Sequence, residues 1–191
     1  MNFISSHASL RAVGISASPG GTTSRSRRLL DHALSRLEES GIEGALVDLA
    51  LLPAGPLLGR GEDPALARAV SAVAAADILV VASPVYRASY SGLLKVFFDL
   101  LAEDSLVDKV ALPIAAGGGP GHLLAIDHGL RPLLSSLGAI VIPGGVYATP
   151  AGFQDGAPGA VLLQRVDRGV SEALALAAAS RVRLEPLPIE R

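Results

Sequence analysis

The sequence predicts a three-layer α/β protein built on a five-stranded parallel sheet, and three observations support that class. Short apolar runs rich in β-branched residues alternate with longer segments of helical periodicity. The run at residues 78–82 is apolar at every position, as in a central strand that helices cover on both faces. With 191 residues, 50% of them hydrophobic, the chain is long enough for one domain of ordinary size.

Strands and helices are expected to alternate along the whole chain. The strands are expected at residues 10–16, 44–48, 78–82, 110–115 and 139–146. The helices are expected at residues 24–39, 65–75, 89–101, 122–137 and 161–179. Stretches rich in glycine and proline, 51–63 and 152–159, are expected to be surface loops. No repeat or linker divides the chain, so residues 1–191 are predicted to form a single domain with its core at about 10–180.

This alternation is typical of doubly wound sheets of either the flavodoxin or the Rossmann type. In both types the ligand lies beyond the carboxyl ends of the strands, where the strand order reverses. The loops after the first, third and fourth strands are therefore the expected ligand-binding loops.

Composition excludes several classes of function. With 16 Lys and Arg against 18 Asp and Glu, the net charge of −2 gives no basic surplus for binding nucleic acid or anionic lipid. The chain has no cysteine, which excludes disulfides, cysteine-ligated metals and a thiol nucleophile. Redox chemistry in this chain would therefore need a cofactor.

Hydropathy predicts a cytoplasmic homo-oligomer that does not enter a membrane. No stretch approaches the roughly 18 apolar residues of a transmembrane helix, and residues 1–7 lack the features of a signal peptide. A mean hydropathy of +0.46 with only 18% charged residues predicts apolar surface beyond one core, which a second subunit would cover. The alternative is an alanine- and leucine-rich composition that only fills helix interiors.

The first strand runs into a loop of hydroxyl-bearing residues and glycines, and then into a helix. The segment reads Ser16-Ala17-Ser18-Pro19-Gly20-Gly21-Thr22-Thr23-Ser24-Arg25-Ser26. The N–H groups at a helix N-terminus attract anions, and Arg25, Arg27 and Arg28 oppose the helix dipole unless an anion is bound. The loop therefore predicts a phosphate site. The alternative is a helix capped by Ser24, with its arginines in solvent.

Three familiar motifs do not match this loop. The lysine of a P-loop is missing, which disfavours nucleotide hydrolysis, and G-x-G-x-x-G is missing, which disfavours a Rossmann NAD site. The pattern G-x-S-x-G fails because Ser18 stands at its last position, and this disfavours a hydrolase.

The loops after the third and fourth strands suit a flat ring system. Ser83-Pro84-Val85-Tyr86 offers a stiff backbone beside apolar surface after the third strand. Gly117-Gly118-Gly119-Pro120-Gly121 follows the fourth strand, and a backbone without Cβ atoms can approach a flat ligand closely. A tight turn would also account for this glycine cluster.

Together these loops resemble the NADPH-dependent FMN reductase family, and within it the reductase components of two-component alkanesulfonate monooxygenase systems. The resemblance is colinear over about residues 11–146. It is carried by Ser18-Pro19 with Ser24-Arg25-Ser26, by Ser83-Pro84-Val85-Tyr86 with Tyr90-Ser91-Gly92-Leu93-Leu94-Lys95, and by Gly117-Gly118 with His122-Leu123-Leu124-Ala125. It implies a flavodoxin-like fold, FMN held at a subunit interface, NADPH or NADH as the hydride source, a homodimer or homotetramer, and a flavin-dependent monooxygenase as partner.

The resemblance also implies roles for single residues. The FMN phosphate would be held by Ser18, Ser24, Arg25 and Ser26. The ring would be lined by Pro84, Val85 and Tyr86 and contacted by Gly117 and Gly118. The sequence departs from the family where Gly20 and Gly21 follow Ser18-Pro19, because many members have a basic residue there and a shorter loop.

Hydride transfer from nicotinamide to flavin needs the two rings stacked and no obligatory acid or base. No catalytic side chain and no metal ligand are therefore predicted. His122 and His128 are six residues apart, about 240° around a helix, and cannot share a metal from one face. The alternatives are an FMN-bound quinone or azo-compound reductase and a flavodoxin-type electron carrier, although such carriers are usually strongly acidic.

Two helices carry further expectations. The helix at 89–101 has more apolar residues than one stripe requires, which predicts a subunit contact; the alternative is a helix wholly buried in the core. The helix at 122–137 is also apolar on more than one side, so a neighbouring subunit is expected to cover its outer face. The helix at 122–137 should kink or widen because Pro132 cannot donate an N–H to the carbonyl of His128. In some reductases of the family an extra aromatic residue occupies such a widened turn at the tetramer contact, and His128 resembles its counterpart.

Overall fold

The structure is a computed structural model in which residues 10–181 are described. Residues 1–7, judged above for a signal peptide, lie outside this range. The outer limits of the predicted domain also lie outside it, so the single domain over 1–191 stays a prediction.

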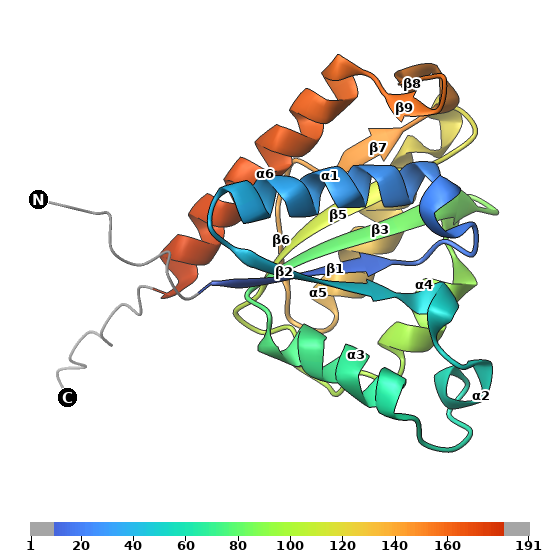
Figure 1. Ribbon diagram of the computed structural model, residues 1–191, viewed down its shortest axis with the longest axis vertical. Coiled ribbons are helices and arrows are strands. Elements are labelled where there is room, and N and C mark those ends of the chain that lie inside the picture. Colours follow the sequence, from blue (N-terminus) through green and yellow to red (C-terminus); the bar gives the residue numbers. More distant parts are fainter. Residues whose placement is uncertain (1–9, 182–191) are drawn as a thin grey trace, which may run out of the picture.

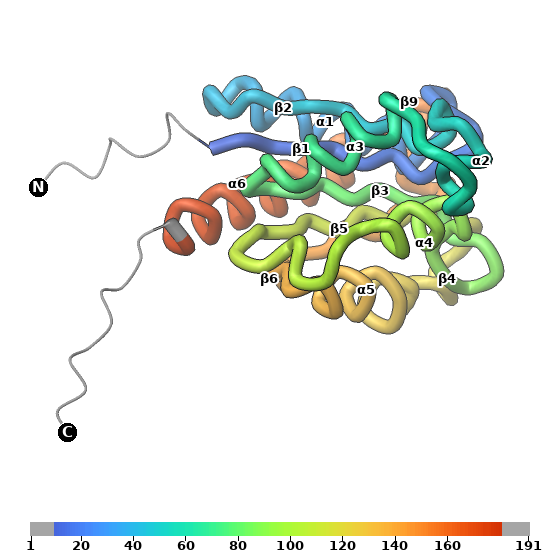
Figure 2. The backbone as a smooth tube through the Cα atoms, turned by 90° about the horizontal axis from the view of Figure 1, so that it is seen from below, coloured from blue at the N-terminus to red at the C-terminus, as the bar shows by residue number. Residues whose placement is uncertain are grey.

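A parallel sheet in the strand order β2-β1-β3-β5-β6 forms the centre of the fold (Figure 2). Its strands are β1 (Arg11–Ser16), β2 (Glu43–Asp48), β3 (Ile78–Tyr86), β5 (Val110–Ala116), β6 (Ile140–Val141) and β7 (Val146–Ala148). The order reverses between β1 and β3, as in flavodoxin, which confirms the predicted three-layer, flavodoxin-like class. The carboxyl ends of β1, β3 and β5 meet at one edge, where Ser16 is in register with Ala82 and Ser83 with Ala115.

Helices cover both faces of the sheet (Figure 1). On one face lie α1 (Arg25–Glu39) and α6 (Ala160–Arg181), which bury leucines such as Leu30 against β3 and β5. On the other face lie α3 (Pro64–Ala75), α4 (Gly92–Phe98) and α5 (Arg131–Ser135), around a core that includes Phe97. Within residues 10–181, none of these helices is long and apolar enough to cross a membrane.

The third strand is longer than predicted. It continues through Tyr86 and turns back at Arg87 and Ala88, with φ of 51° and 65°, into β4 (Ser89–Tyr90). The helix expected at 89–101 is therefore wrong at both ends and spans only Gly92–Phe98. It begins there because Ser91 caps it: the Ser91 Oγ accepts a hydrogen bond from the Leu94 N–H at 3.3 Å.

The fifth strand, expected at 139–146, is broken into β6 and β7. The gap contains Pro143, which has no N–H for a ladder bond. The guanidinium of Arg131 donates to three carbonyls at this gap, those of Val141 at 3.2 Å, Ile142 at 2.9 Å and Pro143 at 3.3 Å. A side chain thus supplies hydrogen bonds to carbonyls where the strand is interrupted.

The predicted helix at 122–137 is not a continuous α-helix. It starts as a 3₁₀-helix, η4 (Pro120–Ala125), passes into a π-helix, η5 (Ile126–Leu130), and ends as α5. The N–H of Arg131 donates to the carbonyl of Ile126, five residues earlier. The distortion predicted ahead of Pro132 is therefore confirmed, as the widened turn rather than a simple kink.

Both stretches predicted as loops contain regular structure. The first holds the short helix α2 (Ala54–Leu57) and is preceded by η3 (Leu49–Leu51). The second begins at the last residue of η6 (Pro150–Gly152) and holds a hairpin of β8 (Phe153–Gln154) with β9 (Ala157–Pro158). A short 3₁₀-helix, η2 (Gly21–Thr23), also forms in the loop after β1. Such two- to four-residue elements lie below the length at which hydrophobic periodicity can be recognised.

Candidate functional site

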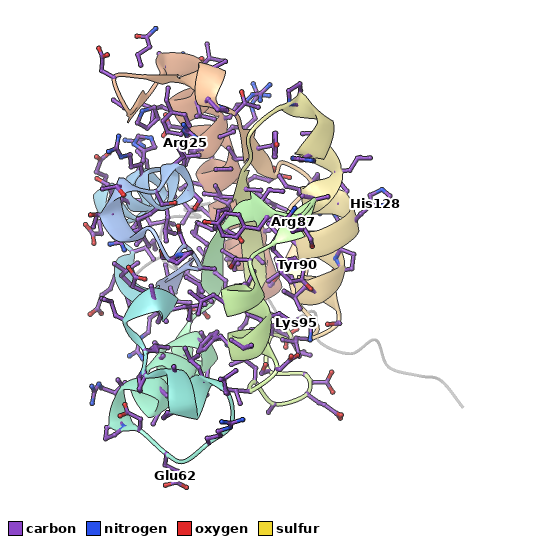
Figure 3. All side chains as sticks on the ribbon, turned by 90° about the vertical axis from the view of Figure 1, so that its right-hand side faces the viewer. Arg25, Glu62, Arg87, Tyr90, Lys95 and His128 are labelled. Carbon is purple, nitrogen blue, oxygen red and sulfur yellow. The ribbon has the colours of Figure 1, made fainter. Side chains whose placement is uncertain are left out.

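A cavity of about 460 Å³ opens at the carboxyl edge of the sheet, where the loops after β1, β3 and β5 meet. Its walls are formed by Thr23, Ser24, Arg25, Arg28, Pro84, Val85, Tyr86, Ala116, Gly117, Gly118 and Gly156. Figure 3 views this edge and shows Arg25 beside α1, with Arg87 and Tyr90 from the β3–β4 hairpin near the centre. The volume lies within the range of small-molecule sites.

One end of the cavity carries hydroxyl groups and cations. Ser24 and Arg25 lie in its wall, as the phosphate prediction requires. Ser18 and Ser26 are buried behind the wall: the Ser18 Oγ accepts from the Gly20 N–H at 3.2 Å, and the Oγ atoms of Ser24 and Ser26 are 3.0 Å apart. The structure thus brings two of the four predicted phosphate residues to the surface of the cavity, and the other two shape the loop.

The three arginines of the first helical turn divide into two groups. Arg27 turns away from the cavity and is almost buried between two carboxylates, with its Nε 2.6 Å from Asp31 and its Nη1 2.7 Å from Asp48. Arg25 and Arg28 both line the cavity. Sequence reasoning did not assign Arg28 to the site, although it follows Arg25 by three residues and so shares its helix face.

The opposite end of the cavity is formed by backbone and ring surfaces. All five predicted ring-contacting residues, Pro84, Val85, Tyr86, Gly117 and Gly118, lie in its wall. A Cβ atom added at Gly118 would meet no atom within 4 Å, so the backbone there borders open space. The sheet register brings these two loops together, because Pro84 pairs with Ala116.

Tyr147 on β7 supports the glycine loop from behind. Its hydroxyl donates to the carbonyl of Gly119 at 2.6 Å, and burial raises the pKa of its phenol. A Cβ atom added at Gly117 would lie 2.2 Å from the Tyr147 hydroxyl oxygen, so any larger residue there would displace the Tyr147 side chain. No local pattern signals this contact, because Gly117 and Tyr147 are 30 positions apart in the chain.

Buried serines connect the loops after β1 and β3. The Ser91 Oγ donates to the carbonyl of Ala17 at 2.7 Å, and the Ser91 N–H donates to the Ser83 Oγ at 2.9 Å. Beneath the β1 loop, the Ser16 Oγ is buried and has no hydrogen-bond partner. An unsatisfied hydroxyl beside an anion-binding loop is the kind of group that a bound ligand or water completes.

The site suits an elongated ligand with an aromatic ring at one end and an anion at the other. Hydroxyl groups, arginines and the N-terminus of α1 would meet the anion, and glycine backbone with Tyr86 would meet the ring. A flavin mononucleotide has this chemistry. No cluster of three or more His, Cys, Asp or Glu side chains suited to a metal ion occurs within residues 10–181. Fold and site together define a flavodoxin-like, ligand-binding α/β protein of the flavoprotein type.

Comparison with known proteins identifies the family. Residues 10–154 match the family model described as NADPH-dependent FMN reductase. The chain belongs to this family. It is an NAD(P)H:FMN oxidoreductase, with FMN and a nicotinamide dinucleotide as cofactors.

Individual relatives agree with this assignment. The chain is 44% identical over 151 residues to the NADH-dependent FMN reductase SfnF of Pseudomonas fluorescens, covering 76% of this chain and 81% of the relative. It is 42% identical over 140 residues, 73% of each chain, to the FMN reductase (NADPH) of Escherichia coli. A crystal structure of the apo form of NADH:FMN oxidoreductase (EMOB) superposes with a TM-score of 0.78 at 34% identity, covering 94% of this chain and 92% of that one.

Proposed function

We propose that FMN is reduced in the cavity at the carboxyl edge of the sheet and leaves as reduced FMN for a sulfonate monooxygenase. The observation that carries the site is the two-ended cavity, with Ser24 and Arg25 at one end and Pro84–Tyr86 facing Gly117–Gly118 at the other. The monooxygenase partner rests on the family resemblance of the loop motifs.

The residues of the cavity have distinct roles in this proposal. Ser24, Arg25 and the first N–H groups of α1 hold the phosphate, while Ser18 and Ser26 fix the shape of the loop. Pro84, Val85 and Tyr86 line one edge of the ring, and the backbone of Gly117 and Gly118 lines another. FMN, when bound, accepts hydride at its ring from a nicotinamide stacked on it. These residues therefore act by binding and orienting rather than by proton transfer.

An FMN titration of Arg25→Ala tests the assignment of the phosphate end. The substitution removes a charge-assisted hydrogen bond of about 1.5–3 kcal/mol, so FMN affinity should fall by more than about tenfold. Arg168→Ala on α6 removes an equal charge from a residue that does not line the cavity, and should bind FMN like the wild type. Equal FMN affinities of Arg25→Ala and wild type would contradict the assignment.

The monooxygenase partner is tested by mixing this protein with a sulfonate monooxygenase and measuring the desulfonated product. Reduced FMN that diffuses away should support a sulfonate monooxygenase in the presence of NADPH or NADH. Formation of the desulfonated product in the mixture, at a rate that rises with the amount of this protein, supports the proposal. NAD(P)H oxidation at full rate without product would contradict the supply of reduced FMN. A cytoplasmic location, predicted from the sequence, belongs to the same proposal.

We also infer a homodimer or homotetramer, with its contact around η4, which overlaps the segment predicted as a helix at 122–137, rather than around α4. The apolar residues of α4 do not form an exposed surplus, because Leu94, Phe97 and Phe98 are buried in their own core. Exposed apolar side chains lie instead at Leu123 and Leu124 on η4 and at Val161 on α6. Leu123 and Val161 line a cavity of about 740 Å³. A second subunit would remove this surface from water.

Light scattering of the FMN-loaded protein at micromolar concentration tests the oligomer. A mass of two or four chains is expected, and a mass of one chain would contradict the oligomer.

His128 is exposed on the π-helix and points away from the protein (Figure 3). If it lies at this contact, His128→Ala should change FMN retention or oligomer size without changing the fold.

A further inference from the structure

The β8–β9 hairpin lies against the first turn of α1 at the phosphate end of the cavity. Its strands pair Phe153 with Pro158 and Gln154 with Ala157, leaving Asp155 and Gly156 as a two-residue turn. Both turn residues have positive φ, 49° and 80°, the conformation that fits the twist of a hairpin. The tip of this hairpin, at Gly156, forms part of the cavity wall.

Two contacts attach the hairpin to α1. The Arg28 Nη1 donates a hydrogen bond to the carbonyl of Gly156. The guanidinium of Arg25 lies over the ring of Phe153, with its Cζ 5.9 Å from the ring centroid, within cation–π range. Both arginines that face the cavity are therefore also contacts of the hairpin.

These arginines differ from Arg27 in their charge environment. Arg27 is neutralised by Asp31 and Asp48. Within residues 10–181, neither Arg25 nor Arg28 forms an ion pair with a carboxylate. Their charges remain available to a phosphate, while a neutral carbonyl and an aromatic face hold them in place.

We propose that the β8–β9 hairpin is a strap that retains FMN, and that Arg28 is the positioning residue that fastens it. This inference rests on the proposed FMN site. Because Gly156 shares the cavity wall with Ser24 and Arg25, a phosphate held there would lie against the tip of the hairpin. In this proposal the phosphate leaves when the Arg28 and Phe153 contacts open. The strength of the fastening therefore sets the rate at which FMN dissociates, and so whether it exchanges between turnovers.

Gly156 shows how closely the strap fits. A Cβ atom at this position would lie 2.6 Å from the Arg28 Nη1, and the φ of +80° is one that side chains rarely adopt. Gly156→Ala should therefore displace the hairpin tip from Arg28 and break the hydrogen bond between them, while the charge of Arg28 is retained.

The FMN dissociation rate, measured by stopped-flow flavin fluorescence, tests the strap. Phe153→Leu is the decisive variant, because Phe153 packs on the core and does not line the cavity, so it reaches the FMN site only through the contact between the hairpin and Arg25. Its dissociation rate should rise about two- to fivefold, as expected for the loss of an exposed cation–π contact. Arg28→Ala should raise the FMN dissociation rate by about tenfold or more above that of the wild type. Phe153→Tyr keeps the ring face and should keep the wild-type rate.

The outcomes separate the strap from the site. An unchanged dissociation rate in Phe153→Leu, with FMN affinity lowered in Arg25→Ala, would overturn the strap and leave the FMN site in place. An unchanged FMN affinity in Arg25→Ala would contradict the site itself. Faster dissociation in Phe153→Leu, Arg28→Ala and Gly156→Ala, with association rates of Phe153→Leu and wild type equal, would support the strap.

Discussion

The hydroxyl of Tyr147 donates to the carbonyl of Gly119 at 2.6 Å and so ties β7 to the glycine loop that borders the ring end of the cavity. Tyr147→Phe removes this bond with little change in packing. The variant should lose about 0.5–1.5 kcal/mol of stability. It should also bind FMN more weakly, because the loop is less constrained. Urea denaturation and an FMN titration measure the two effects, and wild-type values in both would show that the bond does not order the loop.

The same phenol predicts a dependence on pH. Burial raises the pKa of Tyr147 above its ordinary value of 10.0, so the folded protein keeps this proton after the unfolded chain has lost it. The protonated Tyr147 phenol therefore contributes its full share of the free energy of unfolding below about pH 10. This contribution is lost as the pH rises through the pKa of the folded state. The stability difference between wild type and Tyr147→Phe should therefore shrink above pH 10. A difference that stays constant from pH 8 to 11 would contradict this.

Adjacent glycines should respond differently to alanine. Gly117→Ala places a methyl group 2.2 Å from the Tyr147 oxygen and 3.0 Å from its Cζ, so it should cost about 1–3 kcal/mol of stability. Gly118→Ala meets no atom within 4 Å and should change stability by less than about 0.5 kcal/mol. Both should weaken FMN binding, the second purely by filling the cavity. Thermal denaturation measures the stability of the two variants and an FMN titration measures their affinity. Equal stabilities of Gly117→Ala and Gly118→Ala would show that the close contact with Tyr147 is unimportant.

The Arg27–Asp48 pair should stabilise the first turn of α1. Both side chains are about nine-tenths buried, and Asp48→Asn leaves the arginine with only the half-exposed Asp31. Asp48→Asn should lower the free energy of unfolding by about 3 kcal/mol. This is the lower end of the range for a broken buried ion pair, because Asp31 still pairs with Arg27. Asp31→Asn is the matched control and should cost less than about 1 kcal/mol. Urea denaturation measures both, and similar losses would contradict the importance of burial.

The order of the main elements and the meeting of the loops after β3 and β5 in one cavity could be predicted from the sequence. Apolar runs such as 78–82 mark strands, and the parallel arrangement brings their carboxyl ends to one edge, so Pro84–Tyr86 and Gly117–Gly118 meet as expected. The widened turn before Pro132 was also predictable, because a missing N–H has a local consequence.

The remaining features depend on contacts between distant parts of the chain. Tyr147 supports Gly117 and Gly119 from another strand, and Gly156 reaches Arg28 across 128 positions. Burial decided which hydroxyls face the cavity: Ser18 and Ser26 satisfy the predicted motif but point into the loop. Helical periodicity predicts that α4 has apolar residues to spare, but Leu94, Phe97 and Phe98 are buried in the core on their own side of the sheet. Such packing cannot be deduced from local patterns.

The most direct test of the central claim is steady-state oxidation of NADPH and NADH with a large excess of FMN in air, at catalytic amounts of wild type and of Arg25→Ala. The account predicts that the wild type oxidises many equivalents of at least one coenzyme, with an apparent KM for FMN that rises more than about tenfold in Arg25→Ala. Oxidation of only one equivalent of NADPH or NADH per protein chain by the wild type would indicate an electron carrier rather than a reductase. Equal KM values for FMN in the two proteins would contradict the cavity as the site of FMN reduction.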